Sequence, residues 1–203
     1  MRVEAGHTSP WAEWAWASTP LAGEPECADQ AVVVARPDGL VFAVVDGLGH
    51  GADAVAAARK ATATVAQHAT EPLLEIFEAV HRALAGTRGA VMSLGVIDGP
   101  RHALAWTGVG DVEAVHQTAR GGRDALMLVP GVLGDRIPRV RSHAATLAPG
   151  DVIAFASDGV RRSFADELVS PDSPQLLAER ILLRHIRRTD DALALIVRYH
   201  GTA

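Results

Sequence analysis

Two short apolar runs constrain this chain more than any other feature of its sequence. Leu40 to Val45 and Val152 to Ala156 are apolar throughout, and an Asp-Gly pair follows each run within two residues. Runs of this length without polar alternation are typical of strands that are buried on both faces. We therefore expect each run to form an inner strand that brings a carboxylate to the end of a hydrophobic sheet.

The remaining pattern places strands in groups, with helices between the groups. Asp38-Gly39 predicts a tight hairpin between the two strands that flank it. The chain predicts further strands at Trp11 to Thr19, Ala31 to Ala35, Ala90 to Ile97, His102 to Trp106, Val112 to Gln117, Ala125 to Leu128 and Leu193 to Tyr199. Helices are expected at Ala54 to His68, Pro72 to Ala85 and Pro174 to Arg187. The four runs between Ala90 and Leu128 indicate a strand meander.

This order favours an α+β fold over alternating βαβ units. We expect two antiparallel β-sheets packed as a sandwich and flanked by α-helices. At 203 residues, the chain is of the size that forms one domain, so residues 1–203 are expected to be a single domain.

Composition and charge exclude several classes of protein. The formal net charge is -5 and there is no run of Lys or Arg, which argues against a nucleic-acid partner. No apolar stretch reaches the roughly 20 residues that a membrane span requires. The only cysteine is Cys27 and no signal segment precedes the first strand, so the sequence predicts a cytoplasmic protein without disulfides.

Four aspartates stand where predicted strands begin or end: Asp29, Asp46, Asp158 and Asp190. Any one of them can be explained as a turn or cap residue. As a set they are more informative, because strand ends converge easily and carboxylates beside a hydrophobic strand need a counter-charge. Hard oxygen ligands suit magnesium or manganese better than zinc. The sequence therefore predicts a site for divalent cations.

The motifs around these aspartates resemble a known family. Asp46-Gly47-Leu48-Gly49-His50-Gly51 and Ser157-Asp158-Gly159 are similar to signature motifs of PPM-type (type 2C) metal-dependent protein phosphatases, especially the SpoIIE and RsbX branch. Other blocks follow in the same order as in that branch: Cys27-Ala28-Asp29, Arg88-Gly89-Ala90-Val91, Gly108-Val109-Gly110-Asp111 and Asp190-Asp191-Ala192. The resemblance implies hydrolysis of phosphoserine or phosphothreonine on a bacterial regulatory protein, such as a STAS-domain stressosome scaffold.

The resemblance also implies a set of ligands for two divalent cations, Mn²⁺ or Mg²⁺. Asp46 would bridge both cations, while Asp29 and the Gly47 carbonyl would serve one, and Asp158 and Asp190 the other. Asp46, Asp158 and Asp190 would thus be the catalytic residues. A shift of one residue in the alignment would replace Asp190 by Asp191, so both acids stay open as ligands.

Phosphate orientation and proton transfer are less specified. Between Val3 and Ala35 there is no arginine, although eukaryotic relatives place a phosphate-gripping arginine in this early part of the chain. Phosphate would then be oriented by the cations or by another residue. His50 could donate a proton to the leaving oxygen, or it could hold the loop at the helix start.

Three alternative functions deserve comparison. A thiol phosphatase needs an arginine about six residues after its cysteine, and Val33 stands there relative to Cys27. Gly47 to Ala52 satisfies the G-x-G-x-x-G/A pattern of dinucleotide-binding domains, but Asp46 would place a carboxylate beside the pyrophosphate and the predicted strands form hairpins rather than βαβ crossovers. A catalytically weak phosphatase fold that only binds a partner is the third alternative. The oligomeric state stays open.

Overall fold

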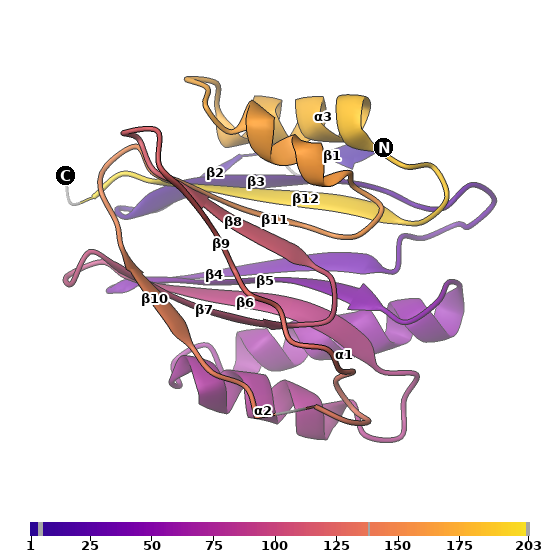
Figure 1. The fold of residues 1–203 in the computed structure, drawn as a ribbon. Coiled ribbons are helices and arrows are strands. Elements are labelled where there is room, and N and C mark those ends of the chain that lie inside the picture. The colour runs from indigo at the N-terminus through magenta and orange to yellow at the C-terminus, as the bar shows by residue number, and fades with distance from the viewer. Residues whose placement is uncertain (4–5, 138, 202–203) are drawn as a thin grey trace.

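The computed structural model describes residues 1–3, 6–137 and 139–201, and it stacks two β-sheets face to face (Figure 1). One sheet has the strand order β10-β7-β6-β5-β4. Its strands are β4 (Asp29–Arg36), β5 (Gly39–Gly47), β6 (Ala90–Asp98), β7 (Ala103–Val109) and β10 (His143–Thr146).

The other sheet has the order β1-β3-β12-β11-β8-β9, and β2 also pairs with β3. Its strands are β1 (Arg2–Val3), β2 (His7–Thr8), β3 (Ala12–Thr19), β8 (Glu113–Gln117), β9 (Arg123–Ala125), β11 (Val152–Ala156) and β12 (Ala192–Tyr199). The first and last long strands, β3 and β12, are neighbours in register over eight residue pairs, from Ala192↔Thr19 to Tyr199↔Ala12.

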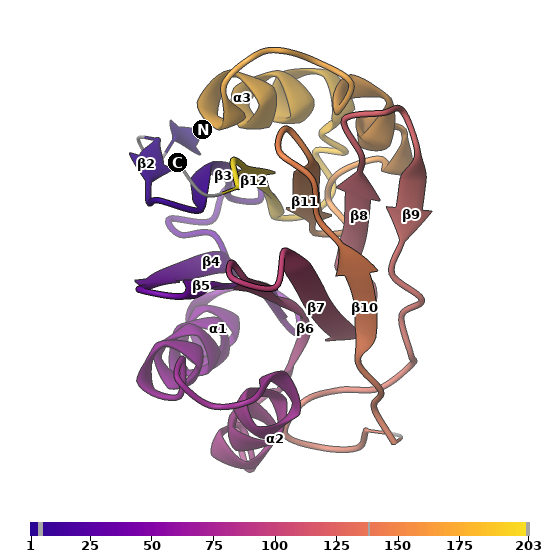
Figure 2. The same ribbon diagram turned by 90° about the vertical axis from the view of Figure 1, so that its left-hand side faces the viewer.

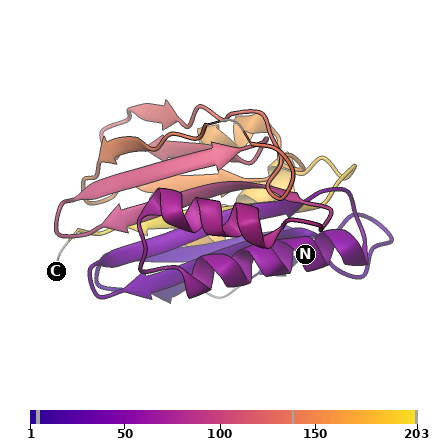
Figure 3. The same cartoon turned by 90° about the horizontal axis from the view of Figure 1, so that it is seen from below.

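Helices cover both outer faces of the sandwich (Figure 2). Helix α1 (Ala52–Gln67) and helix α2 (Leu73–Ala83) lie across the five-stranded sheet, as the view from below shows (Figure 3). Helix α3 (Pro174–His185) covers the seven-stranded sheet, and the short 3₁₀ helix η1 (Arg162–Glu167) precedes it. The predicted fold of two antiparallel sheets flanked by helices is confirmed.

The continuous apolar run in β5 is explained by burial on both faces. Leu40, Phe42 and Val44 belong to the core between the two sheets, where the ring of Phe42 lies 5.1 Å from that of Phe155 on β11. The alternate residues of β5 pack with the buried faces of α1 and α2. Because successive strand side chains point to opposite faces, both layers need apolar residues in this strand.

The structure corrects some of the predicted elements. The expected meander is wrong beyond β7, because β8 pairs with β11 in the other sheet. The chain changes sheet at Gly110, whose φ of 95° is readily adopted only by glycine. The strand expected at Ala125 to Leu128 is displaced to Arg123–Ala125, and α3 ends at His185 rather than Arg187. The sequence did not predict β10, most of whose residues are exposed.

Strand pairing also decides against one alternative function. Every pair formed by the named strands of the described part of the chain is antiparallel. A dinucleotide-binding domain requires parallel strands joined by helical crossovers. Within the described ranges, no helix is both long and apolar enough to cross a membrane.

Candidate active site

One end of the sandwich collects the ends of strands from both sheets, at the right-hand side of Figure 1. In antiparallel sheets the end of one strand lies beside the start of its neighbour. Asp29 begins β4 directly opposite Asp46 in β5, and the Gly47 amide donates to the Ala28 carbonyl at 3.3 Å. Asp158 follows β11 and Asp190 precedes its partner β12. The two sheets therefore each contribute acids to the same edge.

The carboxylate of Asp29 is almost completely buried. Its side chain is 2% exposed, and Oδ2 has no hydrogen-bond partner among the described residues. Burial, and then the charge of Asp46, raise the pKa of Asp29 well above its usual value. A buried carboxylate oxygen without a donor is costly unless a cation compensates it.

Asp46 and Asp158 are also perturbed. Burial, followed by the negative charges of Asp158 and Asp111, raises the pKa of Asp46 to about 8. Burial and the charges of Asp111 and Asp190 raise the pKa of Asp158 as well, and Arg187 partly opposes that effect. These carboxylates thus repel one another across the two sheets, and the repulsion makes the edge a favourable place for cations.

The two consecutive acids before β12 differ in their surroundings. Asp191 is 3% exposed, and its Oδ1 accepts a hydrogen bond from the Leu21 amide at 2.8 Å. Asp190 is exposed, and its Oδ1 accepts from the Asp191 amide at 2.9 Å. Asp191 is therefore engaged with the loop after β3, while Asp190 faces the solvent side of the cluster.

The oxygen ligands at this edge, and their open arrangement, suit magnesium or manganese. The side chains that gather at this edge are carboxylates, which are hard oxygen ligands. Among the described residues, no three His, Cys, Asp or Glu side chains already converge closely enough to form a metal cage. Mg²⁺ usually keeps several waters and takes only one or two protein carboxylates, so an open arrangement suits it.

The loop after β5 is held by neighbours on two sides. His50 Nδ1 lies 2.8 Å from Glu24 Oε1, so the histidine ties this loop to the loop between β3 and β4. The Leu48 amide donates to the Gly89 carbonyl at 3.2 Å. These contacts fix the backbone that carries Asp46 and Gly47. Cys27 also lies near the edge, but burial, and then Asp29, raise the pKa of its thiol, which makes it a poor nucleophile.

The sequence did not single out three charged residues of this region. Asp111 was noted only as part of a motif, yet its charge acts on both Asp46 and Asp158. Arg88 Nη1 donates to the His50 carbonyl at 3.4 Å, and a Cβ placed on Gly49 would lie 3.3 Å from Arg88 Nη2. The Arg187 amide donates to the Gly159 carbonyl at 2.8 Å. Arg88, too, was noted only as part of a motif, and no local pattern shows that it and Arg187 reach the acidic edge, because only folding brings them there.

Comparisons with known proteins agree with this geometry. Residues 36–200 match the family model described as Stage II sporulation protein E (SpoIIE). The phosphoserine phosphatase RsbX of Bacillus subtilis (strain 168) is 26% identical over 138 residues, which are 68% of this chain and 69% of RsbX. The family match thus extends over far more than half of the chain.

Solved structures extend the likeness to the whole fold. A crystal structure of RsbX in complex with magnesium has a TM-score of 0.89 at 21% identity and covers 98% of this chain and 100% of its own. A second solved chain has a TM-score of 0.86 at 28% identity. Its structure is described as "The bacterial stressosome: a modular system that has been adapted to control secondary messenger signaling". It covers 92% of this chain and 99% of its own length.

Proposed function

Because the chain belongs to the SpoIIE family of PPM-type metal-dependent protein phosphatases, we propose that it dephosphorylates serine or threonine on a bacterial regulatory protein. Family membership confirms the predicted fold and the predicted class of enzyme. The observation that carries the proposal is the gathering of carboxylates from both sheets at one edge, where burial and mutual repulsion raise their pKa values.

We assign the carboxylates to two divalent cations, Mg²⁺ or Mn²⁺. Asp46 would contact both, Asp29 and the Gly47 carbonyl would hold one, and Asp158 and Asp190 would hold the other. We choose Asp190 over Asp191 because Asp190 is exposed on the solvent side of the cluster and its charge acts on both Asp46 and Asp158. When bound, such cations neutralise phosphoryl oxygens and activate water for in-line attack.

The other residues of the edge orient the phosphate and hold the loops. Arg88 contacts the loop that carries His50 and Arg187 acts on Asp158, and neither has a carboxylate within ion-pair distance among the residues that the structure describes. A guanidinium with free donors binds phosphate oxygens well. We therefore assign to Arg88 the phosphate contact that the early part of the sequence lacks, with Arg187 beside Asp158. His50 keeps the loop in place through Glu24.

The substrate is a phosphoprotein. The relatives include a phosphoserine phosphatase and a chain of the bacterial stressosome, which supports a phosphorylated STAS-domain scaffold as the partner and a cytoplasmic location. A carboxylate cluster at the edge of a sandwich suits a phosphate presented on a protein surface. Among the described residues, the four phenylalanines and Tyr199 are all buried, so none of them is available to form an aromatic slot for phosphotyrosine.

The test is hydrolysis by the purified full chain of p-nitrophenyl phosphate and of phosphoserine, phosphothreonine and phosphotyrosine peptides, with Mn²⁺, Mg²⁺ or EDTA. We expect cation-dependent activity on phosphoserine and phosphothreonine that exceeds activity on phosphotyrosine. Asp158→Asn should lose nearly all of it, while the exposed Asp124→Asn serves as a matched control. Cation uptake by isothermal titration without any hydrolysis would favour the alternative of a phosphatase fold that only binds its partner.

A further inference from the structure

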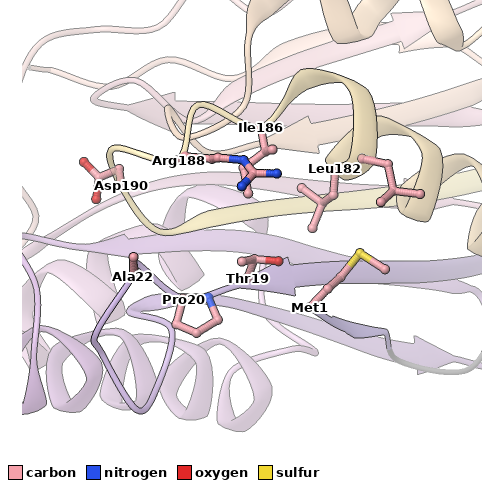
Figure 4. A pocket seen from close by; sticks show the side chains of 9 residues that line it. Met1, Thr19, Pro20, Ala22, Leu182, Ile186, Arg188 and Asp190 are labelled. Carbon is pink, nitrogen blue, oxygen red and sulfur yellow. The ribbon is translucent and has the colours of Figure 1, made fainter.

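A cavity of about 390 Å³ lies beside the acidic edge, between the C-terminal end of α3 and the loop that follows β3 (Figure 4). Its apolar lining includes Leu182 and Ile186 on one side and Pro20 on the other. Arg188 and Asp190, from the loop between α3 and β12, complete the lining. The cavity is therefore apolar inside and polar at the end that meets the carboxylate cluster.

Exposed apolar side chains gather at this cavity. Leu183 on α3 is 71% exposed and Met1 is 60% exposed, and both line it. They are two of the six large apolar residues that are exposed in the described part of the chain. Exposed apolar groups around a hollow are typical of a binding surface, whereas single ones are common and carry no meaning.

The cavity is continuous with the proposed catalytic edge. Asp190 both lines the cavity and belongs to the carboxylate cluster. The loop that holds it is joined to the edge, because the Arg187 amide donates to the carbonyl of Gly159, the residue after Asp158. Arg188 has a backbone φ of 49°. Residues other than glycine rarely adopt this conformation, and such residues are often found at functional sites.

The charge at the rim indicates what occupies the cavity. Arg188 lines the cavity and makes no ion pair with a carboxylate within the described ranges, while its neighbour Arg187 acts on Asp158 of the carboxylate cluster. The one acid at the rim is Asp190, which we assign to a cation. An apolar hollow beside the unpaired guanidinium group of Arg188 fits a segment that carries negative charge and an apolar side chain, as a phosphorylated protein segment does.

We propose that this cavity receives an apolar side chain of the substrate, such as leucine, that lies within about three residues of the phosphoserine. The proposal rests on the function given above. An extended segment advances roughly 3.3 Å per residue, so the Cα atom of a residue three positions away lies about 10 Å from the Cα atom of the phosphoserine. The cavity then selects among phosphoserine sites by the residue beside them, while the cluster acts on the phosphate itself.

A positional scan of phosphoserine peptides tests the preference. Each position from three before to three after the phosphoserine carries leucine or alanine in otherwise matched peptides, and kcat/KM is measured for each. We expect the wild type to prefer leucine at one position by about tenfold, the size of discrimination that an apolar pocket provides. Equal rates for leucine and alanine at every position would overturn the proposal.

Two leucines of α3 provide a matched pair of variants. Leu183→Glu places a charge at the cavity, whereas Leu176→Glu places the same charge on an exposed residue that is 53% accessible and lies outside it. The ratio of leucine to alanine rates should fall toward one in Leu183→Glu and stay at the wild-type value in Leu176→Glu. Ala22→Trp, at an exposed position on the other side of the cavity, should lower the ratio as well. A similar loss in Leu176→Glu, or no loss in the other two variants, contradicts the assignment.

Binding separates this proposal from the proposed function. Fluorescence anisotropy of the labelled leucine and alanine phosphopeptides measures the preference without hydrolysis. If the wild type hydrolyses nothing but binds the leucine peptide about tenfold more tightly, the phosphatase function fails and the cavity assignment stands. If it hydrolyses the leucine and alanine peptides equally, the phosphatase function stands and the cavity assignment fails. A dimer in sedimentation that Leu183→Glu dissociates would show instead that a second copy covers the cavity.

Discussion

Asp46→Asn should stabilise the cation-free protein and yet remove its response to cations. The pKa of Asp46 rises from 3.8 to about 8 because the carboxylate is buried among other acids. The folded state therefore holds the proton more tightly than the unfolded state does. The stability associated with this group is complete below pH 3.8 and is lost as the pH rises toward about 8.

The expected stabilisation of Asp46→Asn follows from the difference between the folded and unfolded pKa values of Asp46. Each pH unit above the unfolded value costs up to about 1.4 kcal/mol, so at pH 7 the upper limit is about 4 kcal/mol. Screening by solvent and relaxation of neighbouring carboxylates reduce this, so we expect about 2–4 kcal/mol of stabilisation in the asparagine variant. For a chain of this size the melting temperature should rise by about 5–15 °C.

The assay is thermal unfolding of wild type, Asp46→Asn and the control Asp124→Asn at pH 5, 7 and 8.5, with EDTA or with saturating Mn²⁺. The gain from the asparagine should grow from pH 5 to pH 8.5 in EDTA. With Mn²⁺ the wild type should gain about 2.7 kcal/mol at a hundredfold excess over Kd, and the variant should gain little. A cation-free Asp46→Asn that is less stable than wild type, or that keeps the full Mn²⁺ response, refutes the reasoning.

Three further outcomes are expected. Asp190→Asn should lose most activity, whereas Asp191→Asn should keep most of it, since the amide oxygen can still accept from the Leu21 amide; steady-state kinetics decide, and the reverse order would move the ligand by one residue. Arg88→Ala should raise the inhibition constant of inorganic phosphate about tenfold without changing Mn²⁺ affinity, and Arg82→Ala, a surface arginine, is its control. Gly159→Ala should fail to accumulate as folded protein in circular dichroism, because its Cβ would lie 1.8 Å from the Asp191 carbonyl; a wild-type melting curve would show that the loop can move.

The sequence predicts the interior of this fold better than its edges. The hairpin of β4 and β5 follows from Asp38-Gly39 and two apolar runs, and the structure confirms it. The short strand β10 was missed because its residues, His143 to Thr146, are mostly exposed and carry no apolar alternation. The transfer of β8 to the second sheet was missed because the backbone turns at a single glycine, Gly110, which no periodicity reveals.

The same division holds for the candidate site. The aspartates could be found in the sequence, because each stands just before or after an apolar run that predicts a buried strand. The structure places Asp29, Asp46, Asp158 and Asp190 at one edge, and their roles as ligands stay predictions. The place of Arg88 at this edge could not be read from its motif, since it stands in a loop far along the chain and reaches the edge only through the packing of α2 and β6.

The pairing of β3 with β12 has a consequence for the synthesis of the protein. Strands β4 to β7 are close in sequence, so most of the five-stranded sheet can form while translation continues. The larger sheet cannot close until β12 emerges and inserts between β3 and β11. Contacts between such distant segments form late and slowly. Asp158 and Asp190 flank this last insertion. A nascent chain would therefore hold only part of the acidic edge and stay inactive until β12 is in place, and a chain truncated before β12 would stay inactive.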